Sequence, residues 1–445
     1  MLDLFSVSIR NVGRNKRRTA ITIITIVIGV VVVIGARGLL NGLQSEIRSG
    51  LTRKVHGDLQ IHKKGYQDSL DSSPYKMMMP FTAADAAKIK EDPRIQSVAP
   101  RLRVMALLNH QKSQTSTPVM VSGIDSAAEL AVCPRLTQAV QSGKMIDSSL
   151  EQNTASVDDA NLDEAIGLDD GAPGGDRPVA SAPKSTGFHQ ILVTPTLMRG
   201  LDAKLGDEIV LLIPDKNNMQ QALIATLTGV VDYGLPNGGA RMAWLDFNTL
   251  QKAVGVVGLA SEIAIRTTDG IDENLVAASL RKVVPEDQVV ETWLELGAFF
   301  RDVMATQNSL FTAVLGIIFI IMISAIVNTS LMTVMERTRE IGTLMALGYR
   351  RNHILVLFLG ESATIGFGGG IAGILFAALA VNLLGAQGMN FTITGSNVPT
   401  ILYPWVGTNF LGLVLSLATG SALIAGLIPA YRASRLKPVE ALTSN

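Results

Sequence analysis

The sequence predicts an α-helical membrane protein with four transmembrane helices and a large mixed α/β extracytoplasmic domain inserted between helices one and two. Three observations lead to this fold class. Only 17% of the 445 residues are charged, whereas a soluble domain has roughly 25%, and the mean hydropathy is +0.32. The apolar residues are concentrated in four long blocks. Residues 41–302, between the first two blocks, have the mixed composition of a folded domain.

Composition also excludes several classes of protein. The 38 basic and 38 acidic side chains give zero net charge, which argues against a general nucleic-acid binder. The single cysteine, Cys133, excludes a disulfide scaffold or a cysteine-based metal site, because both need several sulfurs. No HExxH, GxSxG or GxxxxGKS/T motif occurs, and the five histidines have no metal-binding spacing. We therefore predict no catalytic, cofactor-binding or metal-binding residues, and we expect that the chain is not an enzyme.

A transmembrane helix needs about 20 mostly apolar residues. We predict such helices at residues 19–40, 303–335, 352–384 and 405–431. The first has no small-residue cleavage site after it, which argues against a signal peptide. The third contains glycine pairs four residues apart, a spacing that lets helix backbones approach closely, so we predict a packed partner helix. The residues assigned to helix packing are Gly366, Gly369, Gly370 and Gly373.

The third predicted helix also contains one intramembrane acid, Glu361. We expect this carboxylate either to pair with Arg350, Arg351 or His353 at the inner end of its helix, or to link the segment before that helix to the helix itself.

The distribution of basic residues predicts the orientation, because cytoplasmic loops retain Lys and Arg. Basic clusters precede the first helix, lie between the second and third, and follow the fourth, whereas residues 385–404 contain no charge. We therefore place both termini, residues 336–351 and the tail at 432–445 in the cytoplasm, and the domain at 41–302 and the short loop at 385–404 outside. Residues 1–18 have apolar residues at helical spacing, which predicts a cytoplasmic interfacial helix. A frayed terminus is the alternative.

The outer domain is predicted to mix strands and helices. Alternating or β-branched runs predict strands at 57–62, 98–108, 119–124, 190–193, 208–213, 223–231 and 262–266, and helical spacing predicts helices at 82–91, 196–205, 246–254 and 272–283. Residues 145–176 contain nine acids and no base, which predicts a disordered or loosely packed loop within an acidic insertion at about 145–185. A docking surface for a basic partner is the alternative.

The segment at 328–351, NTSLMTVMERTREIGTLMALGYRR, is the most informative part of the sequence. Ile341, Leu344, Met345 and Leu347 recur at helical spacing and predict a short helix that ends at Gly348. A solvated loop would instead be rich in turn residues and polar side chains. Because an apolar stripe on a cytoplasmic helix is an exposed patch unless a partner covers it, this segment is the candidate docking site.

This segment resembles the coupling helix of the ABC transporter permeases that include the macrolide exporter MacB, the lipoprotein-releasing Lol permeases and the cell-division permease FtsX. In that family the pattern ERxREIGxLxALG docks on an ATPase. The matching residues are Glu336, Arg337, Arg339, Glu340, Ile341, Gly342, Leu344, Ala346, Leu347 and Gly348. The resemblance extends to RNVGRNKRRTAITIITIVIGV at the first helix, to Glu361 with the glycines after it, and to the ending PAYRASRLKPVEAL.

In the outer domain, residues 191–206, ILVTPTLMRGLDAKLG, and residues 121–125 are similar to the MacB-like domain of that family. The acidic stretch resembles an insertion relative to that pattern. Pro183 alone gives poor support for the proline-containing hook with which lipoprotein-releasing permeases recruit a carrier, so the outer partner stays open.

The resemblance implies a permease subunit that couples ATP hydrolysis by a separate ATPase to movements of a periplasmic domain. The expected partners are an ABC ATPase dimer that binds ATP and Mg, a second permease copy or paralogue, membrane lipid and a periplasmic carrier or adaptor, with no nucleic acid. The expected location is the bacterial inner membrane. We expect release of lipoprotein or lipid-anchored cargo. The alternatives are MacB-like export of a small molecule or peptide through an adaptor and outer-membrane duct, and FtsX-like signalling to a cell-wall hydrolase.

Overall fold

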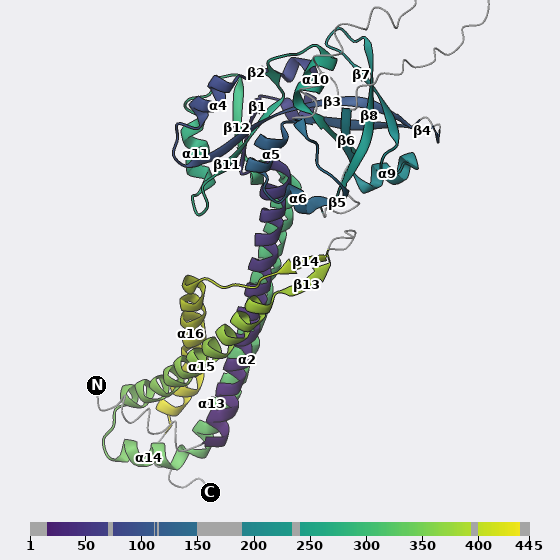
Figure 1. Ribbon diagram of the computed structural model, residues 1–445. Coiled ribbons are helices and arrows are strands. Elements are labelled where there is room, and N and C mark those ends of the chain that lie inside the picture. Colours follow the sequence, from purple (N-terminus) through teal and green to yellow (C-terminus); the bar gives the residue numbers. More distant parts are fainter. Residues whose placement is uncertain are drawn as a thin grey trace, which may run out of the picture. The chain divides into compact units, whose positions relative to one another are not determined.

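The computed structural model describes residues 16–69, 74–110, 112–113, 115–148, 189–233, 241–392 and 399–436. The chain forms two compact units (Figure 1). Unit 1 comprises Met1–Glu46, Asp302–Phe391 and Ile401–Asn445, and unit 2 comprises Ile47–Arg301 and Thr392–Thr400.

Four long apolar helices dominate unit 1. They are α2 (Lys16–Gly50), α13 (Ala298–Glu336), α15 (Arg351–Gln387) and α16 (Thr408–Ser434), and each is long and apolar enough to cross a membrane. The first three predicted spans fall within these helices, and the fourth overlaps α16, which begins at Thr408 and not at residue 405. Helix α2 continues past the predicted span to Gly50, and α13 already begins at Ala298. Residues 47–50 of α2 and 298–301 of α13 lie in unit 2.

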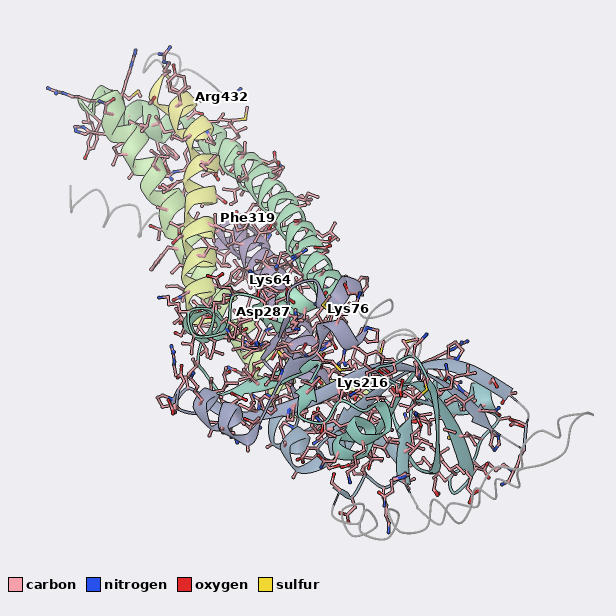
Figure 2. All side chains as sticks on the ribbon, turned by 90° about the horizontal axis from the view of Figure 1, so that it is seen from above. Lys64, Lys76, Lys216, Asp287, Phe319 and Arg432 are labelled. Carbon is pink, nitrogen blue, oxygen red and sulfur yellow. The ribbon has the colours of Figure 1, made fainter. Side chains whose placement is uncertain are left out.

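The core of unit 1 is built from one stripe of each helix. Ile26 of α2, Met322 of α13 and Ala418 of α16 are almost completely buried in it, and Phe319, labelled in Figure 2, is 9% exposed. The outer faces of the same helices remain apolar, with many exposed Ile, Leu, Val and Phe side chains. A helix that is apolar on all sides is typical of a lipid-facing position.

The connection between α15 and α16 contains a short hairpin, of β13 (Met389–Thr392) and β14 (Pro399–Leu402), which are paired in a two-stranded sheet. The sequence predicted only a loop here. Gly388, at φ +68°, begins the hairpin, and its backbone N–H donates to the carbonyl of Leu384 at the end of α15.

Unit 2 is built on a ten-stranded sheet with the order β12-β1-β11-β3-β4-β9-β6-β8-β5, in which β7 pairs with both β3 and β8. The strands are β1 (Leu59–Lys63), β3 (Ile95–His110), β4 (Thr115–Ile124), β5 (Val140–Gly143), β6 (His189–Val193), β7 (Glu208–Pro214), β8 (Gln220–Val231), β9 (Met242–Asp246), β11 (Glu262–Thr267) and β12 (Gln288–Thr292). A separate two-stranded sheet pairs β2 (Met79–Pro80) with β10 (Leu259–Ala260).

Short helices complete unit 2. They are α3 (Tyr66–Ser69), α4 (Ala83–Ile89), α5 (Ser126–Val132), α6 (Leu136–Ala139), α9 (Pro195–Leu201), α10 (Phe247–Val254), α11 (Glu273–Leu280) and α12 (Trp293–Leu296), together with the π-helix η1 (Leu51–His56) and the 3₁₀-helix η2 (Pro74–Met77). The helices predicted at 196–205 and 272–283 are shorter in the structure. Asp202 adopts a left-handed conformation after α9 and ends it, at φ +48°.

The edge of the sheet that contains β12, β1 and β11 is covered by helices. Ile61 of β1 is paired with Ile263 of β11 and with Val290 of β12, so these three side chains form one row across the sheet. Helices α4 and α11 lie on the same side of these strands in Figure 1, and α11 packs Val276 and Leu280 into the same apolar cluster as the row.

Two predicted features lie mostly outside the described residues. Of the predicted interfacial helix at 1–18, only residues 16–18 are described, and they already belong to α2. The predicted acidic loop and Pro183 fall within residues 149–188, apart from residues 145–148 at the start of the loop.

Candidate coupling site

The candidate site lies where α13 ends and α14 (Thr338–Ala346) begins. Arg337, between the two helices, has φ −99° and ψ 14°, so the chain turns sharply there. The predicted helix is therefore confined to nine residues, and it ends two residues before Gly348. Gly348 has φ +94°, and the N–H groups of Gly348 and Tyr349 donate to the carbonyls of Met345 and Leu344. A left-handed glycine after a helix is a common terminator, because glycine has no Cβ to clash.

An ion pair connects this turn to the next long helix. Nη1 of Arg337 lies 3.0 Å and 3.3 Å from the two carboxylate oxygens of Glu361 in α15, and Nε lies 3.0 Å from Glu340 in α14. The guanidinium also lies over the ring of Phe358, 5.8 Å from its centroid. The side chains of Arg337 and Glu361 are only 18% and 11% exposed, so this contact is poorly screened by water.

Burial opposes the charged form of Arg337, but Glu361 and Glu340 outweigh it and raise the pKa of this arginine above its ordinary value. The guanidinium therefore remains charged at physiological pH and provides the bridge between α14 and α15.

Beneath this ion pair, α14 packs on its own chain. Ile341 is 2% exposed and lies in a cluster with Val334 of α13, Ile354 and Phe358 of α15, and the end of α16. Leu344 and Met345 pack against the same cluster and are partly buried. Three of the four residues of the predicted apolar stripe therefore pack within unit 1.

The rest of α14 faces outward. Leu347 is 78% exposed, and Met335 at the end of α13 is 77% exposed. The ten residues of the predicted coupling pattern thus divide into two groups. Arg337, Glu340, Ile341, Gly342 and Leu344 are buried or partly buried, whereas Glu336, Arg339, Ala346, Leu347 and Gly348 are exposed.

The four glycines predicted for helix packing contact two different helices. A Cβ on Gly366 would lie 2.5 Å from Ala422 of α16, and one on Gly370 would lie 2.9 Å from Leu415 of the same helix. On the neighbouring face, Cβ atoms on Gly369 and Gly373 would meet Ile26 and Val30 of α2 at 3.0 Å and 2.7 Å. The pairs four residues apart therefore allow α15 to approach both α16 and α2 closely.

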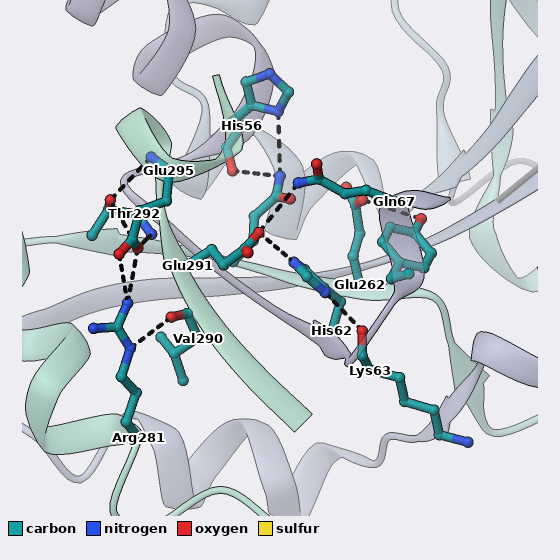
Figure 3. A network of polar contacts seen from close by, with 12 residues as sticks. His56, His62, Lys63, Gln67, Glu262, Arg281, Val290, Glu291, Thr292 and Glu295 are labelled. Atoms are coloured by element: carbon teal, nitrogen blue, oxygen red, sulfur yellow. Dashed lines mark hydrogen bonds and ion pairs between the residues drawn. The ribbon is translucent and has the colours of Figure 1, made fainter. Parts of the chain in front are cut away.

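Within unit 2, the last residues of α2 and those of η1 contact α11, α12 and the loop before α11. Arg48 pairs with Glu273 of α11 at 2.7 Å, and Nε1 of Trp293 in α12 donates to the same carboxylate. Arg53 of η1 pairs with Asp269 at 2.5 Å. Nearby, Figure 3 shows Glu291 of β12 accepting from His62 of β1. The end of α2 and the segment leading into α13 are thereby fixed to the same part of the sheet.

A buried ion cluster stabilises the centre of unit 2. Arg101 of β3 contacts Glu129 of α5 at 2.6 Å and Glu262 of β11 at 3.1 Å, and Arg103 reaches Glu262 at 3.1 Å. Burial opposes ionisation of Glu262, but Arg103 and Arg101 outweigh it and hold the pKa of this carboxyl below its usual value. The neighbouring thiol of Cys133 is fully buried, and burial raises its pKa to about 12. None of this was predicted from the sequence, because the residues come from three separate elements.

Two family models match the chain. The MacB-like periplasmic core domain matches residues 19–283, and the FtsX-like permease C-terminal domain matches residues 312–438. The first match covers more than half of the chain. The chain belongs to the MacB/FtsX-like ABC permease family.

Several curated relatives of this permease carry the name macrolide export ATP-binding/permease protein MacB. The protein from Psychrobacter cryohalolentis is 24% identical over all of this chain and 60% of its own length. The protein from Hyphomonas neptunium is 36% identical over 41% of this chain and 27% of its own length. This permease thus spans about 60% of the length of relatives that match it from end to end.

Solved structures similar to this permease include two outer domains. The periplasmic region of MacB from Actinobacillus actinomycetemcomitans covers 55% of this chain and 92% of that one, with 11% identity and a TM-score of 0.33. The extracellular domain of the noncanonic ABC-type transporter YknZ from Gram-positive bacteria covers 53% and 99%, with 14% identity and a TM-score of 0.32.

The family assignment and the four apolar helices identify the permease as a multi-pass membrane protein with an outer domain of mixed α and β structure. The sequence singled out residues 336–348 and Glu361 as candidates, but it did not name Arg337 as the partner of Glu361. The signal was present, because Arg337 belongs to the coupling pattern, yet sequence gives no distance between residues that lie on different helices.

Proposed function

We propose that this permease couples ATP hydrolysis by ABC ATPase subunits to movements of its outer domain. One observation carries this proposal. Helix α14 has an exposed apolar end at Leu347, while its other end is bonded to α15 through Arg337 and Glu361. A helix exposed on one side and rigidly attached on the other is suited to receive force from a partner and pass it on.

The proposed route begins at α14. Closure of the ATPases on ATP would press on the exposed end of this helix, and the Arg337–Glu361 ion pair would pass the displacement to α15. Helix α13 leads directly into the turn before α14, so it would move with it. Helices α2 and α13 each continue into unit 2, where Arg48, Glu273 and Trp293 connect their ends.

The proposed assembly contains two permease copies, or one copy and a paralogue, with two ATPase subunits that bind ATP and Mg. The 445 residues contain no GxxxxGKS/T loop, which supports an ATPase outside them and no enzymatic activity within them. We place the assembly in the bacterial inner membrane, with both termini and α14 in the cytoplasm, because basic residues collect at those positions.

For the cargo we propose lipoprotein or lipid-anchored molecules released from the outer leaflet. Four helices per chain are too few for a pathway across the bilayer, whereas a large outer domain can act on cargo at its surface. Export of a small molecule or peptide is the second candidate, and the end-to-end match to relatives named macrolide exporters favours it.

Copurification from native membranes tests this proposal. The permease should bring down an ABC ATPase, and the reconstituted complex should hydrolyse ATP faster when its cargo is present. Stimulation by a lipoprotein with its carrier would support the first cargo class, and stimulation by small molecules alone would support the second. An isolated permease without any ATPase partner would contradict both.

A further inference from the structure

Unit 2 contains a cleft of about 880 Å³ between α4, α11 and the sheet. Its floor is formed by Ile61 of β1 and Ile263 of β11, which belong to the row of paired residues described above. The walls are also apolar. They include Phe81, Ile89, Leu280 and Val284. Ligand pockets typically have volumes of about 300–1,000 Å³ and predominantly apolar linings, so the cleft has the size and interior of a small-molecule site.

The cleft exists because the two helices cover the sheet unequally. Helix α11 buries Val276, Ala277 and Leu280, whereas α4 buries none of its side chains fully. Helix α4 is nevertheless well formed, since Thr82 and Asp85 make a capping box at its start. Nε and Nη2 of Arg94 bind Asp92, and Nη2 also donates to Ser279 of α11, so this arginine connects the two walls.

The charges around the cleft favour a cation. Its lining contains four carboxylates, Asp85, Glu91, Asp92 and Asp287, and two basic residues, Lys88 and Arg94, which leaves a balance of two negative charges. Asp85 is used by the capping box and Asp92 by Arg94.

The carboxylates of Glu91 and Asp287 have no hydrogen-bond or ion-pair partner in the part of the chain that the structure describes, and both residues are exposed. Asp287, labelled in Figure 2, lies just before β12, where its carbonyl accepts from the N–H of Lys64.

The helix backbones also contribute negative potential to the cleft. Both helices present their C-terminal turns to the cleft, α4 through Lys88 and Ile89 and α11 through Ser279 and Leu280. The C-terminal end of a helix carries a partial negative charge, which stabilises cations. We propose that this cleft binds an organic cation with an apolar body, with the apolar part against Ile61 and Ile263 and the positive charge between Glu91 and Asp287.

Binding is tested on the full chain in phosphatidylcholine nanodiscs, without ATPase or nucleotide, so the result is independent of the proposed function. The probe is tetraphenylphosphonium in equilibrium dialysis, with empty nanodiscs subtracted. We expect saturable binding of one cation per chain. Tetraphenylborate, which has the same shape and the opposite charge, should bind much more weakly. Equal binding of the two ions, or no saturable binding of the cation, would overturn the proposal.

Variants then locate the charge. Glu91→Gln with Asp287→Asn should raise the dissociation constant about tenfold, the effect expected for two exposed charge contacts. The matched control is Glu208→Gln with Glu286→Gln, which removes the same charge from two exposed carboxylates that do not line the cleft. Equal weakening by both double variants would show that the cation responds only to overall charge, and the cleft would not be the site.

A second measurement locates the apolar body. Val283 lines the cleft and is 64% exposed, so Val283→Cys should fold normally and react with a membrane-impermeant maleimide. The only native cysteine, Cys133, is buried and adds no background. Tetraphenylphosphonium should slow labelling at position 283 over the same concentrations at which it binds. Unchanged labelling at saturation would place the cation elsewhere and refute the assignment.

Discussion

The guanidinium of Arg337 meets the carboxylate of Glu361 at 3.0 Å, although 24 residues separate them in the chain. Glu361 is therefore bonded to the turn before α14, and the alternative partners, Arg350, Arg351 and His353, are all exposed. This contact agrees with the second of the two roles expected for Glu361, that of a link between the coupling segment and the third long helix.

The first prediction follows from this ion pair. Glu361→Gln removes the charge that Arg337 faces and should cost about 2 kcal/mol of interaction, the value of a hydrogen bond to a charged group. Arg337 keeps Glu340, so α14 should stay folded. We expect ATPase stimulation by cargo to fall while the amount of permease in the membrane and the bound ATPase are unchanged.

Glu340→Gln is the matched control for Glu361→Gln, because it removes the other carboxylate of the same arginine without breaking the link to α15. It should have the smaller effect on stimulation. If both variants reduce stimulation equally, the bridge to α15 has no special role.

The second prediction concerns the exposed end of α14. Leu347→Asp should leave the stability of the permease within about 0.5 kcal/mol, because the side chain is already 78% exposed. It should release the ATPase, since an unpaired charge in a buried interface costs several kcal/mol. The measurement is retention of the ATPase during purification in detergent.

Two further variants make that result specific. Val257→Asp changes a side chain that is 73% exposed in unit 2, and it should retain the ATPase. Leu344→Asp places a charge against the cluster around Ile341 and should lower the thermal stability of the permease itself. Full ATPase retention by Leu347→Asp would contradict the docking proposal.

Features that depend on residues close together in the sequence could be predicted, and features that depend on packing between distant segments could not. The four spans follow from composition over about 20 residues, and the sequence identified all of them. Which residues of the coupling segment are buried could not be predicted in this way. Helical spacing places Ile341, Leu344 and Leu347 on one stripe, but packing against α13, α15 and α16 covers the first two and leaves Leu347 exposed. The cleft depends on the unequal packing of α4 and α11, and no local pattern records that.

The third prediction tests the close contact of α15 and α16. Gly366→Ala would place a Cβ 2.5 Å from Ala422 and 3.1 Å from the carbonyl oxygen of Ala418, so the helix backbones must move apart. Overpacking of this kind typically costs about 1–3 kcal/mol. Gly368→Ala is the matched control, because a Cβ there meets no atom within 4 Å. Alanine is the better helix former, so the control should be neutral or slightly stabilising. Thermal melting in detergent measures both, and equal melting temperatures would show that the glycine contact is dispensable.

The last prediction concerns Glu262, whose side chain is 1% exposed between Arg101 and Arg103. Glu262→Gln leaves Arg101 with Glu129 alone and removes the carboxylate that Arg103 contacts. Breaking a buried ion pair by removing one partner costs about 3–5 kcal/mol, because the other charge stays buried without compensation. We expect the free energy of unfolding to fall by this amount at pH 7. Maleimide labelling of Cys133 should also become faster, because Nη2 of Arg101 lies 3.5 Å from its sulfur and the thiol is normally enclosed.

The effect of Glu262→Gln on stability should depend on pH. The pKa of Glu262 is lower in the folded protein than its ordinary value of 4.5, so its carboxylate stabilises the fold fully above that value. As the pH falls below about 4.5, the unfolded chain takes up a proton that the folded protein resists, and the advantage of Glu262 over glutamine shrinks. The difference in melting temperature between wild type and Glu262→Gln should therefore be largest at pH 7 and already smaller at pH 4, and it should keep decreasing as the pH falls further through the folded pKa. Glu208→Gln, at an exposed position, should match the wild type at both. A constant difference across this range would show that the loss arises from packing and not from the charge of Glu262.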